Sequence, residues 1–293
     1  MAPIELDGAP VSGEEGVRKF HGEAVDGREL PSLPIVANKV LEMLKDPDVN
    51  MQKLCRVLAD DTALAARVLA VSRSPRYALR NLPTTLLGAV QVLGIGTLSN
   101  VVIAKVTHGL CIKGNKVSEK LWSHSVAVAL AMRLLSKRAG VRDGELAFLA
   151  GLMHDVGQII LIQDDPSAYE KLVKEKLDPP LSIVDREQAH YGLDHMAIGN
   201  TLLAQWNMDP QLAQAALNHH SDVVGDGATQ MAEMLAVADY LCSKCDLGFF
   251  TEPPTPAAET LARYGLADEQ TVGEFASQIR QAHREESALF NAV

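Results

Sequence analysis

Apolar residues recur at helical spacing along most of the chain, and this pattern predicts a protein built from short helices. From Pro34 onward, apolar side chains fall three and four positions apart until Asp46 and Pro47 stop the stripe. The stretches 48–58 and 61–69 repeat the pattern, each behind an Asp or Asn that suits a helix N-cap. The period-two alternation typical of strands is absent from the sequence. We therefore predict an all-α fold.

The segment 81–104 needs separate treatment, because its 24 residues carry no charge. An uncharged apolar run of this length could cross a bilayer. However, Pro83, three glycines and several polar residues interrupt the run. These interruptions favour two buried helices joined near Gly94 and Gly96, so we expect no membrane span.

Downstream of a loop at 113–116, cap residues predict where the next helices begin. Ser118 is expected to open a long helix that ends near Lys137, and Asp143 with Glu145 is expected to open the following one. Further helices are expected near 181–191, 194–206, 209–219, 228–245 and 268–290.

Composition narrows the class of protein and its partners. The 293 residues are 47% hydrophobic but only 4% aromatic, which favours aliphatic helix packing over a β-sandwich. A net charge of −10 argues against generic nucleic-acid binding and against an anionic membrane surface. Four scattered cysteines cannot form a disulfide framework, and the first residues lack the apolar run of a secretory signal. We therefore expect a cytoplasmic protein.

Histidines concentrate in the second half of the chain, which makes this half the candidate for chemistry. Six of the nine histidines fall within one hundred residues of predicted helix, namely His124, His154, His190, His195, His219 and His220. His154 directly precedes Asp155, and neighbouring helical positions diverge by about 100°. Both side chains could therefore bind one metal only near a helix end or kink, which Gly157 could supply. Gly199 follows His195 by one turn and is expected to leave open space beside that imidazole.

Two interpretations of this cluster stay open. Asp239 lies in a strongly apolar helix, where a carboxylate is costly unless it is paired or coordinated. Imidazole and carboxylate together suit divalent Fe, Mn, Zn or Ni. The other interpretation is a metal-free cluster in which each Asp pairs with a protonated His.

Several separate motifs resemble one known family. In the first half these motifs are Leu30-Pro-Ser-Leu-Pro34, Leu58-Ala-Asp-Asp-Thr-Ala-Leu64, and Thr85-Leu-Leu-Gly-Ala-Val90 with Leu93-Gly94. In the second half they are Leu121-Trp-Ser-His-Ser-Val126, Ala150-Gly-Leu-Met-His-Asp-Val-Gly157, Glu187 with Gly192-Leu-Asp-His195 and Gly199, and Asn218-His-His220. Their order and spacing from about 30 to 222 resemble the HDOD domain, the HD-related output domain of bacterial signalling proteins.

The resemblance implies two packed helical bundles and a set of metal ligands. The second bundle would be similar to the HD metal-dependent phosphohydrolases, in which a His, a His-Asp pair and a later Asp hold the metal. The matching positions here are His124, His154, Asp155 and Asp239. His195, His219 and His220 resemble the added ligands of two-metal relatives that cleave cyclic dinucleotides, with Glu187 as a further candidate.

The resemblance also implies a division of the chain. Residues 30–225 would be the HDOD domain. Residues 1–29, before it, mix Gly, Pro and charges without apolar periodicity, so we expect them to be a flexible lead-in. Within that domain, an N-terminal bundle would occupy about 30–112 and the HD-like bundle would begin near 118. Residues 226–293, which include Asp239, would complete the HD-like bundle.

Two departures from the two-metal relatives bear on activity. Gln158 stands where those relatives carry a lysine, and no Gly-Tyr-Pro sequence follows His219 and His220. A phosphodiester transition state carries negative charge that a cation stabilises better than a neutral amide does. We therefore do not expect cyclic di-GMP hydrolysis, and the sequence assigns no catalytic residue.

Two functions follow from these observations. The leading hypothesis is a bacterial signal-transduction module that acts through contacts with signalling partners and retains a metal site, with a nucleotide as a further candidate ligand. The alternative is a metal-dependent phosphohydrolase acting on a nucleotide or phosphodiester.

Overall fold

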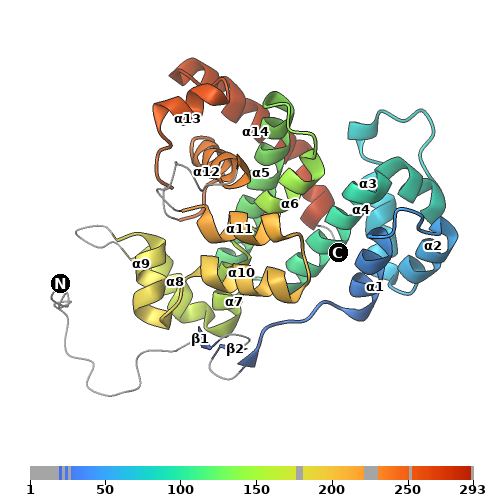
Figure 1. The fold of residues 1–293 in the computed structure, drawn as a ribbon, viewed down its shortest axis with the longest axis horizontal. Coiled ribbons are helices and arrows are strands. Elements are labelled where there is room, and N and C mark those ends of the chain that lie inside the picture. The colour runs from blue at the N-terminus through green and yellow to red at the C-terminus, as the bar shows by residue number, and fades with distance from the viewer. Residues whose placement is uncertain are drawn as a thin grey trace.

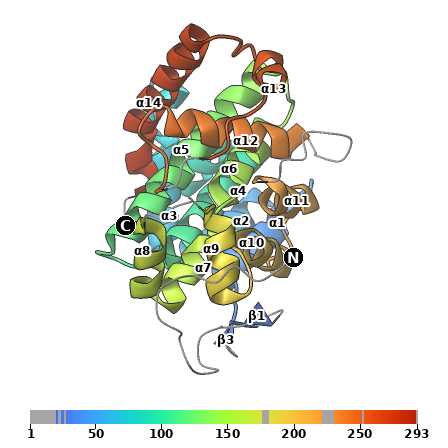
Figure 2. The same cartoon turned by 90° about the vertical axis from the view of Figure 1, so that its left-hand side faces the viewer.

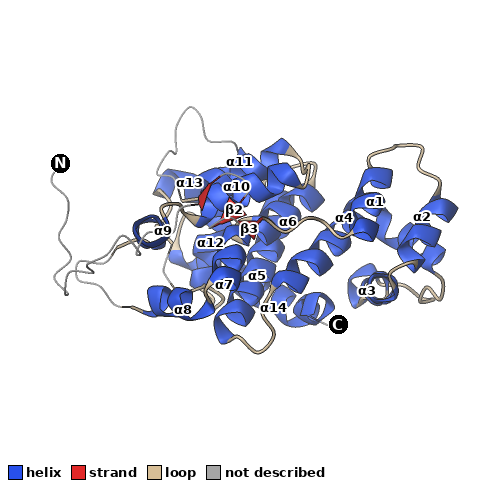
Figure 3. Ribbon diagram, turned by 90° about the horizontal axis from the view of Figure 1, so that it is seen from below, coloured by secondary structure: helices blue, strands red, loops and turns tan. Residues whose placement is uncertain are grey.

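The computed structural model describes residues 20–21, 24–25, 28–175, 181–220, 230–250 and 253–291. Helices dominate these residues, which confirms the all-α prediction (Figure 3). The strands β1 (Phe20–His21), β2 (Ala24–Val25) and β3 (Arg28–Glu29) pair antiparallel in the order β1-β2-β3. Two-residue strands are too short to leave an alternating pattern, so they could not be predicted from the sequence. The rest of the predicted lead-in lies outside the described residues.

The first helices follow the predicted apolar stripes. They are α1 (Ile35–Leu44), α2 (Met51–Ala59), α3 (Thr62–Ser72), the short 3₁₀ helix η1 (Pro75–Tyr77) and α4 (Leu86–Leu110). Asn50 and Asp61 cap α2 and α3 by accepting hydrogen bonds from backbone N–H groups, as predicted. Ile35 is an exception, because 86% of it is exposed although it belongs to the predicted stripe. It occupies the first helical position, beyond the reach of the core.

Residues 86–104 of the uncharged segment form most of α4, and the predicted break is present at Gly94. Its φ of 71° and ψ of 174° lie outside the helical region and in a part of backbone space that favours glycine. By length and composition alone, 86–110 and 144–164 could each cross a membrane. In the folded chain, 50% and 89% of their most apolar windows are buried inside the protein. Burial of this kind is also found in the core helices of soluble proteins.

The second half contains ten helices among the described residues. They are α5 (Lys116–Arg138), α6 (Gly144–Met153), α7 (Val156–Asp164), α8 (Pro166–Lys174), α9 (Ile183–Tyr191), α10 (His195–Gln205), α11 (Pro210–Asn218), α12 (Gln230–Ser243), α13 (Ala258–Arg263) and α14 (Glu269–Asn291). α5 begins two residues before the predicted Ser118, because Asn115 is the N-cap and accepts from the Ser118 N–H. α8 and α13 were not predicted.

The arrangement of these helices determines what lies near the centre of the second half. α5 packs along α6 and is flanked by α12 and α14, while α10 packs on both α7 and α11 (Figures 1 and 2). A Cβ atom on Gly151 would lie 2.7 Å from the Ala129 Cα, so this glycine permits the close approach of α6 to α5. The helices α5, α6, α7, α10, α11 and α12 thus surround a common interior.

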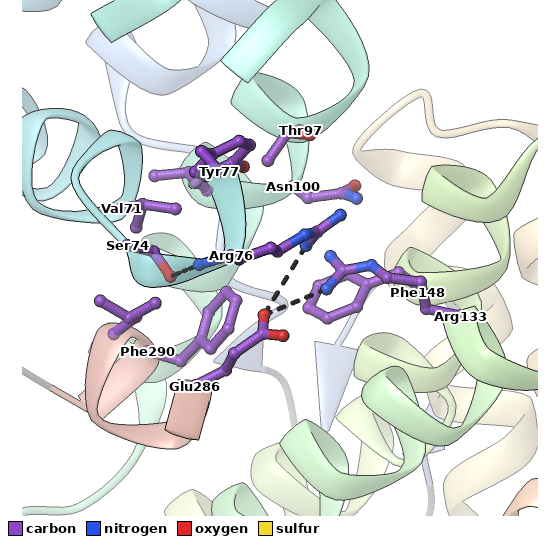
Figure 4. A pocket seen from close by; sticks show the side chains of 12 residues that line it. Val71, Ser74, Arg76, Tyr77, Thr97, Asn100, Arg133, Phe148, Glu286 and Phe290 are labelled. Atoms are coloured by element: carbon purple, nitrogen blue, oxygen red, sulfur yellow. Dashed lines mark hydrogen bonds and ion pairs between the residues drawn. The ribbon is translucent and has the colours of Figure 1, made fainter. Parts of the chain in front are cut away.

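The C-terminal end of α14 joins the two halves. Glu286 Oε2 lies 3.6 Å from Arg76 Nη1 and 3.3 Å from Arg133 Nη1 (Figure 4). Arg67, buried in α3, donates to the Leu289 carbonyl in the last turn of α14. The cavity between these groups has a volume of about 10 Å³, which is room for one water molecule. Charged pairs therefore link the first four helices to the rest of the chain.

Candidate metal centre

A break between two helices brings His154 and Asp155 to the same point. α6 ends at Met153, and Asp155 has φ −101° and ψ 17° before α7 begins at Val156. The chain changes direction there, so His154 Nε2 lies 3.1 Å from Asp155 Oδ2. The predicted helix end is therefore present.

Gly157 has a different role from the predicted kink. A Cβ atom at this position would lie 2.0 Å from the His195 carbonyl oxygen. Gly157 therefore allows α7 and α10 to pack backbone against backbone. Gly199 serves the same packing, because its Cβ would meet Val156 Cγ1 at 3.5 Å and Gly157 N at 3.6 Å. The expectation of open space beside His195 was wrong, since α7 fills it.

Asp155 lies at the centre of the cluster and uses both of its oxygens. Oδ2 faces the Nε2 atoms of His154 and, at 3.7 Å, His124. Oδ1 lies 3.3 Å from His195 Nε2 and 3.4 Å from His219 Nε2. Two groups of potential metal ligands therefore share one carboxylate. They are His124, His154 and Asp155, and Asp155, His195, His219 and His220.

The two remaining predicted ligands lie at the edges of this cluster. Asp239, on α12, places Oδ1 3.3 Å from His124 Nε2. The His220 ring is 4.1 Å from the His219 ring and 5.2 Å from the His195 ring, measured between centroids. The structure thus brings all seven predicted ligand side chains into one region, although they come from six helices or the ends of those helices.

Backbone carbonyls orient three of the imidazoles. Nδ1 of His124 donates to the Leu247 carbonyl at 2.9 Å, Nδ1 of His154 to Gly151 at 2.8 Å, and Nδ1 of His219 to Ala216 at 2.7 Å. A carbonyl oxygen only accepts, so each of these Nδ1 atoms carries the hydrogen. In the neutral rings the Nε2 lone pairs therefore face Asp155. This is the orientation that a metal-binding histidine requires.

The cluster fits a divalent cation. His154 Nε2 and Asp155 Oδ1 are buried and have no hydrogen-bond partner among the described residues. Lone pairs that face a carboxylate repel it unless a proton or a cation lies between them. Imidazole nitrogens and carboxylate oxygens are the ligands that Fe, Mn, Zn and Ni share. A metal would satisfy the orphaned atoms and offset the buried charge together.

Protons can partly replace a cation in the metal-free protein. Burial alone would raise the pKa of Asp155, but His154 and the nearby imidazoles outweigh it and hold that pKa well below its usual range. Burial would lower the pKa of His195, but the Glu187 carboxylate outweighs it and raises the pKa to about 9. Burial and the neighbouring His219 together hold the pKa of His220 well below its usual value. The protonated cluster therefore remains the competing interpretation.

Glu187 and Gln158 lie differently from the ligands that the resemblance suggested. Glu187 is fully buried and contacts Nδ1 of His195 from the outside, so it belongs to neither ligand group. Gln158, in the first turn of α7, is 2% exposed, and its Oε1 has no hydrogen-bond partner in the described structure.

Tyr169 is a residue near the centre that the sequence did not reveal. Its hydroxyl donates to Glu187 Oε1 at 2.6 Å, and its side chain is fully buried. Tyr169 lies on the unpredicted helix α8, where an isolated tyrosine resembles any core residue. The Asp165-Pro166 sequence, a cap followed by a proline suited to the first helical turn, could have indicated this helix.

An all-helical fold with a buried cluster of histidines around a His-Asp pair defines an HD-related protein. Comparison with known families agrees, because the HDOD domain matches residues 30–222. The chain belongs to the HDOD domain family.

Solved structures share this fold. An HDOD domain protein with unknown function from Geobacter sulfurreducens is 27% identical, with a TM-score of 0.69 over 88% of this chain and 93% of that one. A candidate phosphohydrolase from Shewanella amazonensis SB2B is 23% identical, with a TM-score of 0.69 over 90% and 95%. A candidate metal-dependent phosphohydrolase from the same organism is 16% identical, with a TM-score of 0.65 over 89% and 92%.

A curated relative is longer than this chain. An uncharacterized protein of Treponema pallidum (strain Nichols) is 21% identical over 198 residues, which are 66% of this chain. The match spans 38% of that relative's length.

Proposed function

We propose that this protein is a regulatory module that binds a divalent transition metal at the Asp155 cluster and acts on signalling partners through protein contacts. Membership of the HDOD family supports the regulatory part of the proposal. One observation carries the metal site, namely that Nε2 atoms of four histidines face the Asp155 carboxylate from both sides.

Each of the two ligand groups would bind metal on its own side of Asp155. His124 and His154, with Asp239 beside them, would bind on the Oδ2 side of Asp155. His195, His219 and His220 would bind on the Oδ1 side. A metal bound there supplies Lewis acidity and activates water. The residues themselves exclude solvent, since His124, His154 and His195 are at most 2% exposed.

Gln158 is the reason to favour protein contacts over hydrolysis. It places a neutral, buried amide after the His-Asp-Val-Gly sequence, where a cation would stabilise the charge of a phosphodiester transition state. A metal centre beside a neutral amide suits a structural or sensing role better than rapid phosphodiester cleavage.

Metal analysis tests the site directly. Protein purified without an affinity tag or chelator should contain at least one divalent transition metal per chain. Asp155→Asn, which keeps the size of the side chain but removes its charge, should lose that metal. Asp165→Asn is the matched control, because Asp165 caps α8 away from the cluster and asparagine also caps helices. Metal-free wild-type protein that rejects added Fe, Mn, Zn and Ni would overturn the metal site.

A separate experiment tests the mode of output. Ala substitutions of His154 and Asp155 should leave partner binding intact if the module works through surface contacts. If the response in cells disappears while folding and partner binding persist, the chemistry of the centre, and not the contact, carries the output.

The second candidate function is a metal-dependent phosphohydrolase. A carboxylate shared between two ligand groups favours it, since two-metal sites position both the attacking and the leaving oxygen in phosphoryl transfer. The metal-loaded wild-type protein and its Gln158→Lys variant should both be tested for hydrolysis of bis(p-nitrophenyl) phosphate, cyclic dinucleotides and linear nucleotides. Turnover that requires Asp155 would establish the hydrolase. Absence of turnover in both proteins would exclude it for these substrates.

A further inference from the structure

His195 is oriented differently from the other histidines around Asp155. The Nδ1 atoms of His124, His154 and His219 donate to backbone carbonyls. Nδ1 of His195 instead lies 2.5 Å from Glu187 Oε2, a carboxylate oxygen. The same oxygen accepts the His195 backbone N–H at 2.8 Å. Glu187 therefore fixes both the ring of His195 and the first turn of α10.

Glu187 is itself held in place from a third helix. Its other oxygen, Oε1, accepts the Tyr169 hydroxyl at 2.6 Å. Tyr169, Glu187 and His195 are all 0% exposed, so water does not compete for these hydrogen bonds. Both carboxylate oxygens have partners, and the side chain has one orientation in which all three bonds form. The chain of contacts runs from α8 through α9 to α10.

The chemical difference between a carboxylate and a carbonyl bears on metal binding. A carboxylate that accepts from Nδ1 places negative charge beside the ring and makes Nε2 a stronger electron donor. The other three imidazoles donate to neutral carbonyls instead. The added negative charge therefore reaches the Oδ1 side of Asp155, through His195. The two sides of the shared carboxylate are therefore unequal.

We propose that Glu187 and Tyr169 are positioning residues that set the metal affinity of the His195 side and so couple the α8–α9 pair to the centre. The proposal rests on the metal site of the proposed function. The α8–α9 pair lies at one edge of the molecule, away from α1–α4 (Figure 1). On α9, Asp185, Gln188 and His190 are exposed while Glu187 points inward. A shift of this helix at the surface therefore moves the carboxylate that supports His195.

Metal titration of the full chain with Co²⁺ tests the proposal, with equilibrium affinity and the visible absorption of the bound ion as readouts. Glu187→Gln removes the charge and keeps the shape, and it should weaken Co²⁺ binding by about 10- to 100-fold and alter the absorption spectrum. Tyr169→Phe removes one hydrogen bond to Glu187 and should weaken binding less. Glu170→Gln is the matched control, because Glu170 is a half-exposed glutamate on α8 that pairs with Lys174.

The outcomes separate this proposal from the metal site itself. If wild-type protein binds no Co²⁺, the metal site fails and the role of Glu187 fails with it. If wild-type protein binds Co²⁺ and both variants match it in affinity and spectrum, the metal site stands and the positioning role is wrong. Should Glu187→Gln fail to fold, Tyr169→Phe supplies the same test, because it leaves every charge in place. An Nδ1 proton resonance of His195 that shifts in Tyr169→Phe would support the chain of contacts independently of the metal affinity.

Discussion

The first four helices and the helices from α5 onward bury very different side chains. In the first region the buried polar residues are Arg67, Ser72, Ser74, Thr97, Asn100 and Thr107, of which only arginine is charged. From α5 onward the buried histidines and carboxylic acids are His124, His154, Asp155, Glu187, Asp194, His195, His219 and Asp239. The burial of apolar side chains can account for the stability of the first region. It cannot account for the buried groups of the second region, because buried charges cost several kcal/mol unless they are compensated.

The first four helices therefore support the fold, whereas the helices from α5 onward carry the side chains suited to metal binding. The polar side chains of the first region bond to backbone carbonyls: Ser72 donates to Leu69 within α3, and Asn100 donates to Glu145 of α6. In the second region, five histidines gather around the Asp155 carboxylate. Changes near Asp155 should therefore affect both stability and metal binding, whereas changes in α1–α4 should affect stability alone.

The largest effect is expected from Gly157→Ala. The added Cβ would lie 2.0 Å from the His195 carbonyl oxygen and 2.9 Å from its Cα, and both are backbone atoms that cannot rotate away. We expect a loss of about 3 kcal/mol or more in unfolding free energy, together with loss of metal. Urea denaturation and metal analysis measure the two effects. A variant with wild-type stability would show that α7 and α10 pack less tightly than the structure has them.

The helices could be predicted from the sequence more fully than the candidate metal site could. Caps such as Asn50 and Asp61 and the break at Gly94 are local features, and they appear where the pattern placed them. The candidate ligands came from the family resemblance, because spacing alone cannot show that residues from separate helices meet. The structure brings those residues together around Asp155.

The remainder could not be predicted, for identifiable physical reasons. Three of the groups that orient the imidazoles are backbone carbonyls, which every residue possesses, so no residue type marks them. Glu187 is only a further candidate ligand from the sequence, because a carboxylate can either bind metal or support a histidine. Its distance to Nδ1 of His195 decides between these roles, and that distance is a tertiary property.

Removal of metal should produce the next largest effect and should distinguish the two regions. A ligand that binds only the folded state, and whose concentration is about 100 times its Kd, stabilises that state by about 2.7 kcal/mol. Dialysis against a chelator should therefore lower the Tm and increase hydrogen exchange in α5–α7 and α10–α12. Amides of α1–α3 should be unaffected outside global unfolding. Equal loss of protection in both regions would show that the centre stabilises the chain as one cooperative unit.

The pH dependence of metal-free protein should sharpen the same contrast. The folded-state pKa of His195 is about 9, above its unfolded value near 6.5. Its contribution to stability is therefore complete below about pH 6.5 and is lost as pH rises through about 9. The lowered pKa values of His219 and His220 act in the opposite direction, so stability should also fall as pH drops below about 6.5.

Denaturation curves between pH 5 and pH 9.5 measure both slopes. Metal-loaded protein should lose little stability between pH 6.5 and 9, because metal rather than a proton then occupies the cluster. A metal-free protein whose stability rises over that range would contradict the raised pKa of His195.

A smaller effect is expected where the two regions meet. Glu286 contacts Arg76 and Arg133, and its side chain is 17% exposed (Figure 4). Glu286→Gln should lower the unfolding free energy by about 1–2 kcal/mol, less at high salt, and should leave metal content unchanged. Glu285→Gln, on the exposed face of the same turn, should have almost no effect, since its partner is the neutral Gln281. Equal effects in both variants would show that the contacts of Glu286 contribute nothing specific.

The smallest expected effect lies in α4 and has the opposite sign. Gly109 is exposed, and a Cβ there would meet nothing within 4 Å. Gly109→Ala should therefore raise the unfolding free energy by about 0.4–1 kcal/mol, because alanine restricts the unfolded chain more than glycine does. Gly114→Ala provides the contrast, since that position also has open space but a φ of 77°. It should destabilise the protein, because L side chains rarely adopt that conformation. Chemical denaturation of both variants separates the effect of room for a Cβ atom from the effect of a positive φ. If both variants gain stability, the turn after α4 does not hold Gly114 at positive φ.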